Sequence, residues 1–241
     1  MFLVVDTDLQ ITKGEYSIMK VIRLAGLAIV AVLVVSLSVA STASAGVYLF
    51  SPGSVGATFV GLSLAGTLRA GADSISCKDD VNAGTIANVH LLGPFDIKFT
   101  SCTASGTGGE NCSAKSPGAA EGEILTHTVH ALLGLVLPAV GLGLGGLLVL
   151  PVSGKQFVTI EETTCTGIAT TITGSVAGLL EDNQGGHLIL EALVLFIPND
   201  IKKIDTLNGL VEPALTAFSE EATLETVEHL TFNRDVLVEV P

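Results

Sequence analysis

Two acids and two histidines gather in the segment EGEILTHTVH, where they could serve as metal ligands. They are Glu121, Glu123, His127 and His130. On a strand, the first three would share one face and His130 would lie on the other, because side chains alternate along a strand. A zinc site would therefore need further ligands from distant parts of the chain. We keep Glu121, Glu123 and His127 as weak metal candidates, expect solvated strand positions instead, and predict no cofactor.

Two serines lie in glycine-containing motifs that resemble nucleophile sites. GLSLAG, around Ser63, nearly matches the Gly-x-Ser-x-Gly elbow of hydrolases, but Ala65 occupies the second glycine position. The elbow also needs a strand, a turn and a helix, whereas this region continues as an alternating strand. We interpret Ser175 in TGSVAG in the same way, as a serine that only resembles a nucleophile. We expect these small residues to allow close packing of strands, and we predict no catalytic residue.

A formal dinucleotide-binding fingerprint, Gly141-x-Gly143-x-x-Gly146, is followed by an acid, Glu161, near the position of a ribose ligand. The motif works only where a strand turns into a helix whose N-terminus faces the pyrophosphate. Here the residues LLVLP follow, and Pro151 would end any helix within two turns. We therefore reject nucleotide binding.

Adjacent acids occur at Asp79-Asp80, Glu161-Glu162 and Glu220-Glu221. None of these pairs has the spacing of a calcium-binding loop, and glycosidase chemistry depends on a separation in space between carboxylates. We interpret the pairs as solvated faces. The whole chain has a formal net charge of −13 with only 11 lysines and arginines, which argues against a nucleic-acid partner because phosphate binding needs clustered basic residues.

Residues 19–45 have the parts of a secretory signal peptide. Lys20 and Arg23 form a positively charged region that an apolar stretch follows, and Ala43-Ser44-Ala45 supplies the small residues of a cleavage site. The mature chain is then predicted to begin at Gly46.

Residues 1–18 include three acids, which do not fit a signal peptide, and we interpret them as an extension upstream of a true start at Met19. An uncleaved anchor helix over residues 19–45 is the alternative. We expect a secreted or cell-surface protein with one mature domain, residues 46–241.

Four cysteines follow the predicted leader, and none lies in it: Cys77, Cys102, Cys112 and Cys165. An even number in an exported chain indicates two disulfides, for which the sequence allows three pairings. The segment between Cys102 and Cys112 is a glycine-rich polar loop whose ends can meet, so we favour the pairs Cys102–Cys112 and Cys77–Cys165. The alternative to disulfides is that the cysteines bind zinc, but the sequence contains no Cys-x-x-Cys motif and no closely spaced Cys/His pair.

Period-two alternation predicts an all-β fold, a sandwich or a barrel. Phe95, Ile97 and Phe99 share one predicted face, and ATLETVEHLTF predicts a strand with Ala222, Leu224, Leu230 and Phe232 on one face. We expect residues 187–197 to form a strand buried on both sides, QFVTIEE and DVLVEV to form further strands, and GLVEPALTAFSEEA to contain the one helical turn.

The stretch ALLGLVLPAVGLGLGGLLVLP, residues 131–151, carries no charge and is long enough to cross a bilayer. Leucine and valine alternate with glycine in its second half, which gives one bulky face on a strand. Pro138 and five glycines would weaken a helix. We therefore expect a core hairpin of two strands joined near Pro138. A membrane helix is the alternative, because Gly141-x-x-x-Gly145 matches a helix-packing pattern.

Several motifs follow one another in a familiar order: SISCKDD, PFDIKFTSC, CSAKSPGAAEGEILT, FVTIEETTC, TGSVAG and a final acidic pair of strands. Over about Gly71 to Val240 this order resembles a recurrent group of exported actinobacterial proteins of unknown function. The resemblance implies export and a β fold and supplies no activity. The apolar stretch 131–151 departs from the pattern of the group, in which a more polar hairpin is expected.

We expect a non-enzymatic extracellular or cell-surface β domain with a structural or interaction role, whose partner is an unknown protein or a component of the cell envelope. Two alternatives stay open. One is a secreted hydrolase whose site is assembled from separated residues. Clustering of Glu121, Glu123 and His127 with another acid or histidine in a pocket would support it. The other is a membrane-active protein that uses residues 131–151.

Overall fold

The computed structural model describes residues 48–106, 111–137, 144–162, 169–181, 188–198 and 201–239, all of them within the unit Gly46–Pro241. These residues form an all-β fold whose one helical turn is the 3₁₀ turn η1 (Pro52–Ser54). No helix in this part of the chain is long and apolar enough to cross a membrane. The predicted fold class is confirmed, and of its two variants the barrel is the one formed.

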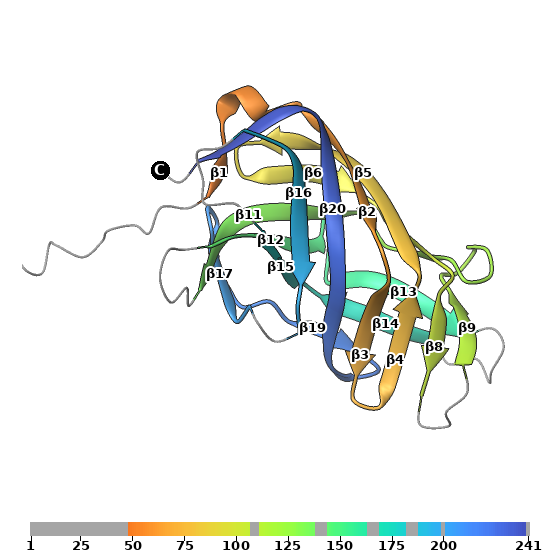
Figure 1. The fold of residues 1–241 in the computed structure, drawn as a ribbon. Helices are drawn as coiled ribbons and strands as arrows, with labels where there is room; N and C mark the ends of the chain where they lie inside the picture. Colours follow the sequence, from red (N-terminus) through yellow and green to blue (C-terminus); the bar gives the residue numbers. More distant parts are fainter. Residues whose placement is uncertain are drawn as a thin grey trace, which may run out of the picture. The chain divides into compact units, whose positions relative to one another are not determined.

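Eight antiparallel strands close into a ring (Figure 1). In order around the ring they are β20 (Glu220–Glu239), β2 (Thr58–Ser63), β5 (Asp79–Asn88), β6 (Leu91–Phe95), β11 (Val129–Leu137), β12 (Leu144–Pro151), β15 (Val176–Leu180) and β16 (Leu188–Phe196), which pairs with β20 again. Ring closure leaves no unpaired edge strand and fixes which side chains point inward.

A second closed circuit continues from the first along the same long strand. From the N-terminal part of β20 it passes through β3 (Gly66–Ala70), β4 (Asp73–Cys77), β8 (Thr103–Ser105), β9 (Asn111–Lys115), β13 (Gln156–Glu162), β14 (Ala169–Gly174) and β19 (Leu215–Ala217), and returns to β20. Strand β20 therefore belongs to both rings, and Figure 1 shows it running from one ring into the other.

The remaining strands extend these rings. Strand β7 (Ile97–Thr100) pairs with β5 and with β10 (Ile124–Leu125), and β1 (Leu49–Phe50) pairs with the end of β20. The alternation predicted for β20 is confirmed: Ala222, Leu230 and Phe232 are buried, and Glu225 and Val227 are exposed.

The apolar stretch 131–151 forms the predicted hairpin, in which β11 pairs with β12 from Val129↔Pro151 to Val136↔Leu144. The joining residues lie outside the described part of the chain. We expected a single bulky face, but β12 is apolar on both faces. Leu147 and Val149 point into the barrel core, whereas Leu148 belongs to a second apolar cluster on the outer side.

The hairpin of β17 (Lys203–Thr206) and β18 (Gly209–Val211) covers this outer side, because β17 pairs with β11 beyond β6. Ile204 of β17 is fully buried against Val136 and Leu148. Two glycines make room for it. A Cβ on Gly146 would lie 2.6 Å from the Val136 side chain and 2.9 Å from the carbonyl oxygen of Gly178, and Gly134 meets β17 in a similar way.

Two strand predictions were wrong in detail. Strand β16, expected to be buried on both sides, exposes Leu188, Leu190 and Leu193 on its outer face, because nothing in the described structure covers that face. The expected helical turn in GLVEPALTAFSEEA is absent from the described residues. Parts of β18, β19 and β20 occupy this segment instead.

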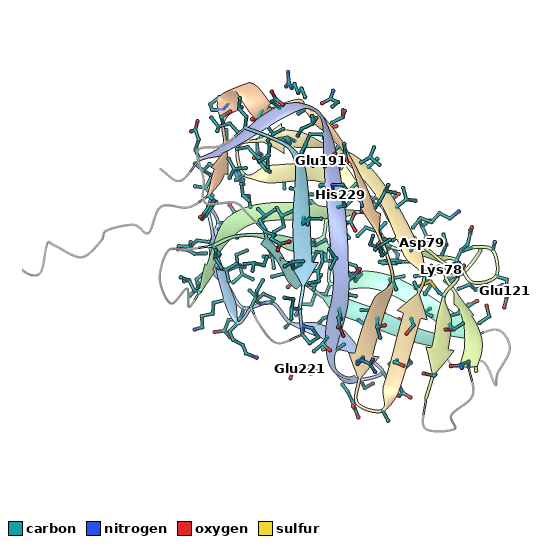
Figure 2. All side chains as sticks on the ribbon, viewed as in Figure 1. Lys78, Asp79, Glu121, Glu191, Glu221 and His229 are labelled. Atoms are coloured by element: carbon teal, nitrogen blue, oxygen red, sulfur yellow. A yellow bond between two sulfur atoms is a disulfide. The ribbon has the colours of Figure 1, made fainter. Side chains whose placement is uncertain are left out.

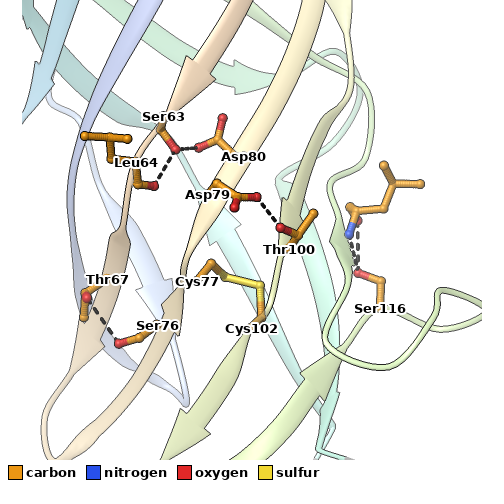
Figure 3. The surroundings of a disulfide bond; sticks show 11 residues. Ser63, Leu64, Thr67, Ser76, Cys77, Asp79, Asp80, Thr100, Cys102 and Ser116 are labelled. Atoms are coloured by element: carbon orange, nitrogen blue, oxygen red, sulfur yellow. Dashed lines mark hydrogen bonds between the residues drawn. A yellow bond between two sulfur atoms is a disulfide. The ribbon is translucent and has the colours of Figure 1, made fainter.

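The disulfide joins Cys77 at the end of β4 to Cys102 just before β8 (Figure 3). This bond overturns both favoured pairs, Cys102–Cys112 and Cys77–Cys165, since each uses one of these two cysteines. The reason is strand register. Ser76 pairs with Thr103, so Cys77 falls opposite Cys102. Cys112 on β9 falls opposite Ala104, and the loop that we expected to close on itself is a β8–β9 hairpin. Cys112 is not a free thiol, and Cys165 lies outside the described residues.

Replacing Gly146 with alanine is expected to destabilise the fold by about 1–3 kcal/mol, because the new Cβ would clash with Val136 and with the backbone of Gly178. The matched control is Gly53→Ala, where the nearest atom, in the Ser51 side chain, is 3.8 Å away. That variant should change stability by less than about 0.5 kcal/mol. Urea unfolding measures both. Equal stabilities would contradict the close packing of Gly146 against Val136 and Gly178.

Candidate functional site

Two apolar cavities of about 60 Å³ each occupy the barrel interior. The first lies within the first ring, where inward side chains of β2, β6, β11, β12, β16 and β20 surround it. The second lies within the other ring, between β3, β4, β13, β14 and β19. Four side chains line both cavities: Phe99, Phe157, Val176 and Leu224. The two spaces are therefore neighbours, and these four residues lie at their boundary.

A row of buried polar side chains lies across three adjacent strands, and its two acids line the first cavity. Ser63 of β2 pairs across the sheet with Asp80 of β5 on one side and with Glu228 of β20 on the other. The Ser63 hydroxyl donates a hydrogen bond to Asp80 Oδ2 (Figure 3). The carboxyls of Asp80 and Glu228 lie close enough for each to influence the pKa of the other. Asp80 and Glu228 are only 4 % and 7 % exposed, so this row is buried.

Asn82 extends the row by one inward position along β5. Its amide Nδ2 donates a 2.7 Å hydrogen bond to Glu228 Oε1. This bond passes over Gly61, where a Cβ would lie 2.1 Å from the same Glu228 oxygen and 2.5 Å from Asn82 Oδ1. Any side chain at position 61 would therefore displace the Asn82–Glu228 pair.

Three buried oxygens lack a hydrogen-bond partner: Asp80 Oδ1 and Asn82 Oδ1 in the row, and Thr226 Oγ1, which lies two residues before Glu228 on β20, on the side away from Asn82. All three residues line the first cavity. A buried polar atom without a partner costs about 1–3 kcal/mol, and native interiors rarely contain several close together.

The electrostatics of the row follow from burial without a nearby cation. Burial raises the pKa of Glu228 to about 8, and the neighbouring Asp80 charge adds to this effect. Burial likewise raises the pKa of Asp80, although hydrogen bonds from Ser63, Glu228 and Asn82 oppose the rise. At pH 7 Glu228 therefore keeps its proton, and the two carboxyls titrate as a coupled pair.

The metal candidates do not form a site in the described part of the chain, which contains no group of three or more potential metal ligands. Glu121 lies in a turn and precedes β10, so it does not share one strand face with Glu123 and His127 as predicted. Glu123 instead forms a 2.7 Å ion pair with Lys98. Burial lowers the pKa of His130, which lies on β11.

The two serine motifs occupy different environments in the structure. Ser63, set aside as a nucleophile, is part of the buried polar row. Ser175 lies between β14 and β15, where its N–H bonds to the Ala214 carbonyl oxygen. The adjacent Gly174 has a φ of 112° and approaches Ala214 too closely for a Cβ, in line with the expected close packing. Of the fingerprint glycines, Gly141 and Gly143 lie outside the described residues.

Sequence reasoning missed the acidic residues of the row. Asp80 was interpreted as solvated together with Asp79, but only Asp79 is exposed. Glu228 was not singled out. A signal for it existed, because it occupies the same face of β20 as Leu224 and Leu230. An acid in register with an apolar face indicates a buried polar site.

The outer surface carries an exposed apolar row over neighbouring strands. Leu193 of β16, Leu62 of β2 and Val81 of β5 lie in one cross-strand register together with His229 of β20. Their exposed fractions are 38 %, 54 % and 41 % for the three apolar side chains. His229 forms a 3.3 Å contact with Glu191, and Figure 2 shows the two residues on adjacent strands.

The predicted cleavage residues Ala43, Ala45 and Gly46 lie outside the described residues. Comparisons with protein-family models, with curated proteins and with solved structures find no match for this chain.

Replacing Glu228 with glutamine is expected to change how stability depends on pH. The folded state binds the Glu228 proton up to a pKa of about 8, whereas the unfolded chain releases it near the ordinary glutamate pKa of 4.5. The wild type therefore loses stability as pH rises between these values, by about 2–4 kcal/mol. The glutamine variant lacks this loss, so its stability relative to wild type should increase from pH 5 to pH 8.

Urea unfolding at several pH values measures the effect, with Glu225→Gln, an exposed position on the same strand, as the control. A constant difference between Glu228→Gln and wild type across this range would contradict a raised pKa.

Proposed function

We propose that this protein is an exported, non-enzymatic β-barrel domain that binds a small, largely apolar molecule inside the barrel. The observation that carries the proposal is the pair of neighbouring apolar cavities in the two rings, the first of which contains a small group of inward polar atoms. Apolar walls with a few convergent polar groups are the usual composition of a small-molecule site.

The arrangement of the walls supports this role. Large side chains such as Phe59 and Phe95 contact each other edge to face, with ring centroids 5.4 Å apart, and still leave space beside them. Closed eight-stranded barrels either fill their interior with side chains or hold one small ligand. The residual space together with unpartnered polar atoms favours the second case here.

The disulfide supports the export part of the proposal, because disulfides persist in oxidising compartments outside the cytoplasm. The signal peptide over residues 19–45 and a secreted or cell-surface location belong to the same proposal. The exposed row of Leu62, Val81 and Leu193 supports an additional contact with a protein or a cell-envelope component.

The two alternatives receive less support. The hydrolase requires Glu121, Glu123 and His127 to lie together in a pocket, and none of them lines either interior cavity. The membrane-active protein requires the bulky residues of the 131–151 hairpin to face outward without cover. Instead, Ile204 of β17 packs against the outer side of that hairpin.

The binding proposal predicts that the protein takes up a small neutral apolar molecule such as n-pentane or xenon. Methyl-resolved NMR should show saturable shifts confined to residues lining the cavities, such as Ala131, Leu147 and Val194. Ala131→Leu, which fills the first cavity, should weaken n-pentane binding at least about tenfold.

The matched control is Ala83→Leu, the same substitution at an exposed position on β5, which should leave binding unchanged. Absence of saturable shifts in the wild type, or equal binding by both variants, would overturn the proposal. A native circular-dichroism spectrum shows that Ala131→Leu has folded.

The export proposal predicts a secreted product that begins at Gly46 and has no free thiol. Peptide mapping without reduction should join Cys77 to Cys102 and leave Cys112 and Cys165 to pair with each other. Reduction should therefore raise the intact mass by four hydrogens. A product that retains residues 19–45, or a peptide that joins Cys102 to Cys112, would contradict the corresponding part of the account.

A further inference from the structure

We propose that Asp80 and Asn82 bind the ammonium head of a short primary alkylamine, whose alkyl chain occupies the first cavity. This inference rests on the proposed function, because it names the ligand class of the same interior site. The alternatives are a neutral alcohol, which would share the hydrogen bonds without the charge, and ordered water alone.

The hydrogen-bonding capacity of the site matches a primary ammonium group. Asp80 Oδ1 and Asn82 Oδ1, at successive inward positions of β5, are buried oxygens without partners, and both can accept hydrogen bonds. A primary ammonium has three N–H donors and no acceptor, as in a lysine side chain. One such head group beside these two neighbouring positions would satisfy both oxygens.

The charge of the site also favours a cation. Asp80 and Glu228 are the titratable side chains that line the first cavity, and no lysine, arginine or histidine is among the described residues that line either cavity. The buried negative charge therefore has no protein counter-charge beside it. An ammonium ion would supply one, and charge-assisted hydrogen bonds are about twice as strong as neutral ones.

The size of the cavity limits the chain length of the amine. About 10–15 Å³ of cavity volume is needed to hold one water molecule. The first cavity, of about 60 Å³, therefore accommodates about four to six groups of the size of a water molecule. This corresponds to an amine with a chain of about three to five carbons. A longer chain would have to displace Phe99, Phe157, Val176 or Leu224, which lie between the two cavities.

Few other charged groups act on Asp80 and Glu228. Asp79, the next residue along β5, adds a negative charge that raises the pKa of Asp80. From β20 only Glu228 acts on Asp80, and β2 contributes the neutral Ser63. Ionisation of Glu228 above about pH 8 therefore adds a second negative charge and should strengthen binding of a cation.

The test compares n-pentylamine with n-pentanol by isothermal titration calorimetry on the oxidised protein. The amine should bind at least about tenfold more tightly than the alcohol. Its affinity should rise between pH 7 and pH 9, where the amine itself stays protonated, whereas the affinity of the alcohol should not change.

Two variants separate the roles of the acids. Asp80→Asn should weaken amine binding at least about tenfold while n-pentane still binds. Glu228→Gln should bind the amine at pH 7 but lose the rise in affinity toward pH 9. The control Asp79→Asn changes the adjacent, exposed carboxylate and should keep amine binding within about twofold of wild type.

Equal affinity for amine and alcohol, or unchanged amine binding by Asp80→Asn, would overturn the inference and leave the proposed function in place, provided that n-pentane binds. Failure of n-pentane and of both head-group compounds would overturn the proposed function as well. Retained n-pentane binding by Asp80→Asn shows that the cavity of that variant is intact.

Discussion

Ring closure by β20 is the constraint on which the rest of the structure depends. This strand of 20 residues is shared by both closed circuits, and it pairs with β2 and β16 in one ring and with β3 and β19 in the other. Once both rings are closed, alternate residues of every strand must face the interior. The chemistry of the interior is therefore set by the residues at those positions.

Among the described residues, the buried carboxylates of the interior gather where Asp80 and Glu228 lie beside Ser63 and Asn82. Burying carboxylates without a cation is costly, and replacing a buried polar network with well-packed apolar residues is often neutral or stabilising. The row is thus a local departure from the rule that the rest of the interior follows. Such departures concentrate at functional sites, and this is the physical basis of the binding site that we propose here.

Much of the fold was predictable from local alternation. Phe95, Ile97 and Phe99 do share a face and line the first cavity, and residues 131–151 do form a hairpin. The disulfide was not predictable, because its pairing depends on the register of β4 against β8, which a count of cysteines does not contain. The exposure of β16 also depends on what packs outside the barrel.

The polar row was only partly visible in the sequence. Glu228 stands in register with the apolar residues of β20, but Asp80 has an exposed acid beside it, and its burial follows from the pairing of β5 with β2. Ser63 and Gly61 belong to a motif that suggested a nucleophile. Their actual roles, a hydrogen bond to Asp80 and space for the Asn82–Glu228 pair, arise only when three strands are brought together.

The most direct test of this account is an NMR titration of the side-chain carboxyl carbons of Asp80 and Glu228 in the folded protein. A buried pair that shares one proton predicts two separate steps, both above the ordinary values, with that of Glu228 near pH 8. Ordinary titration of both carboxyls near pH 4 would show that the pair is solvated. It would thereby contradict a buried polar site in the barrel interior.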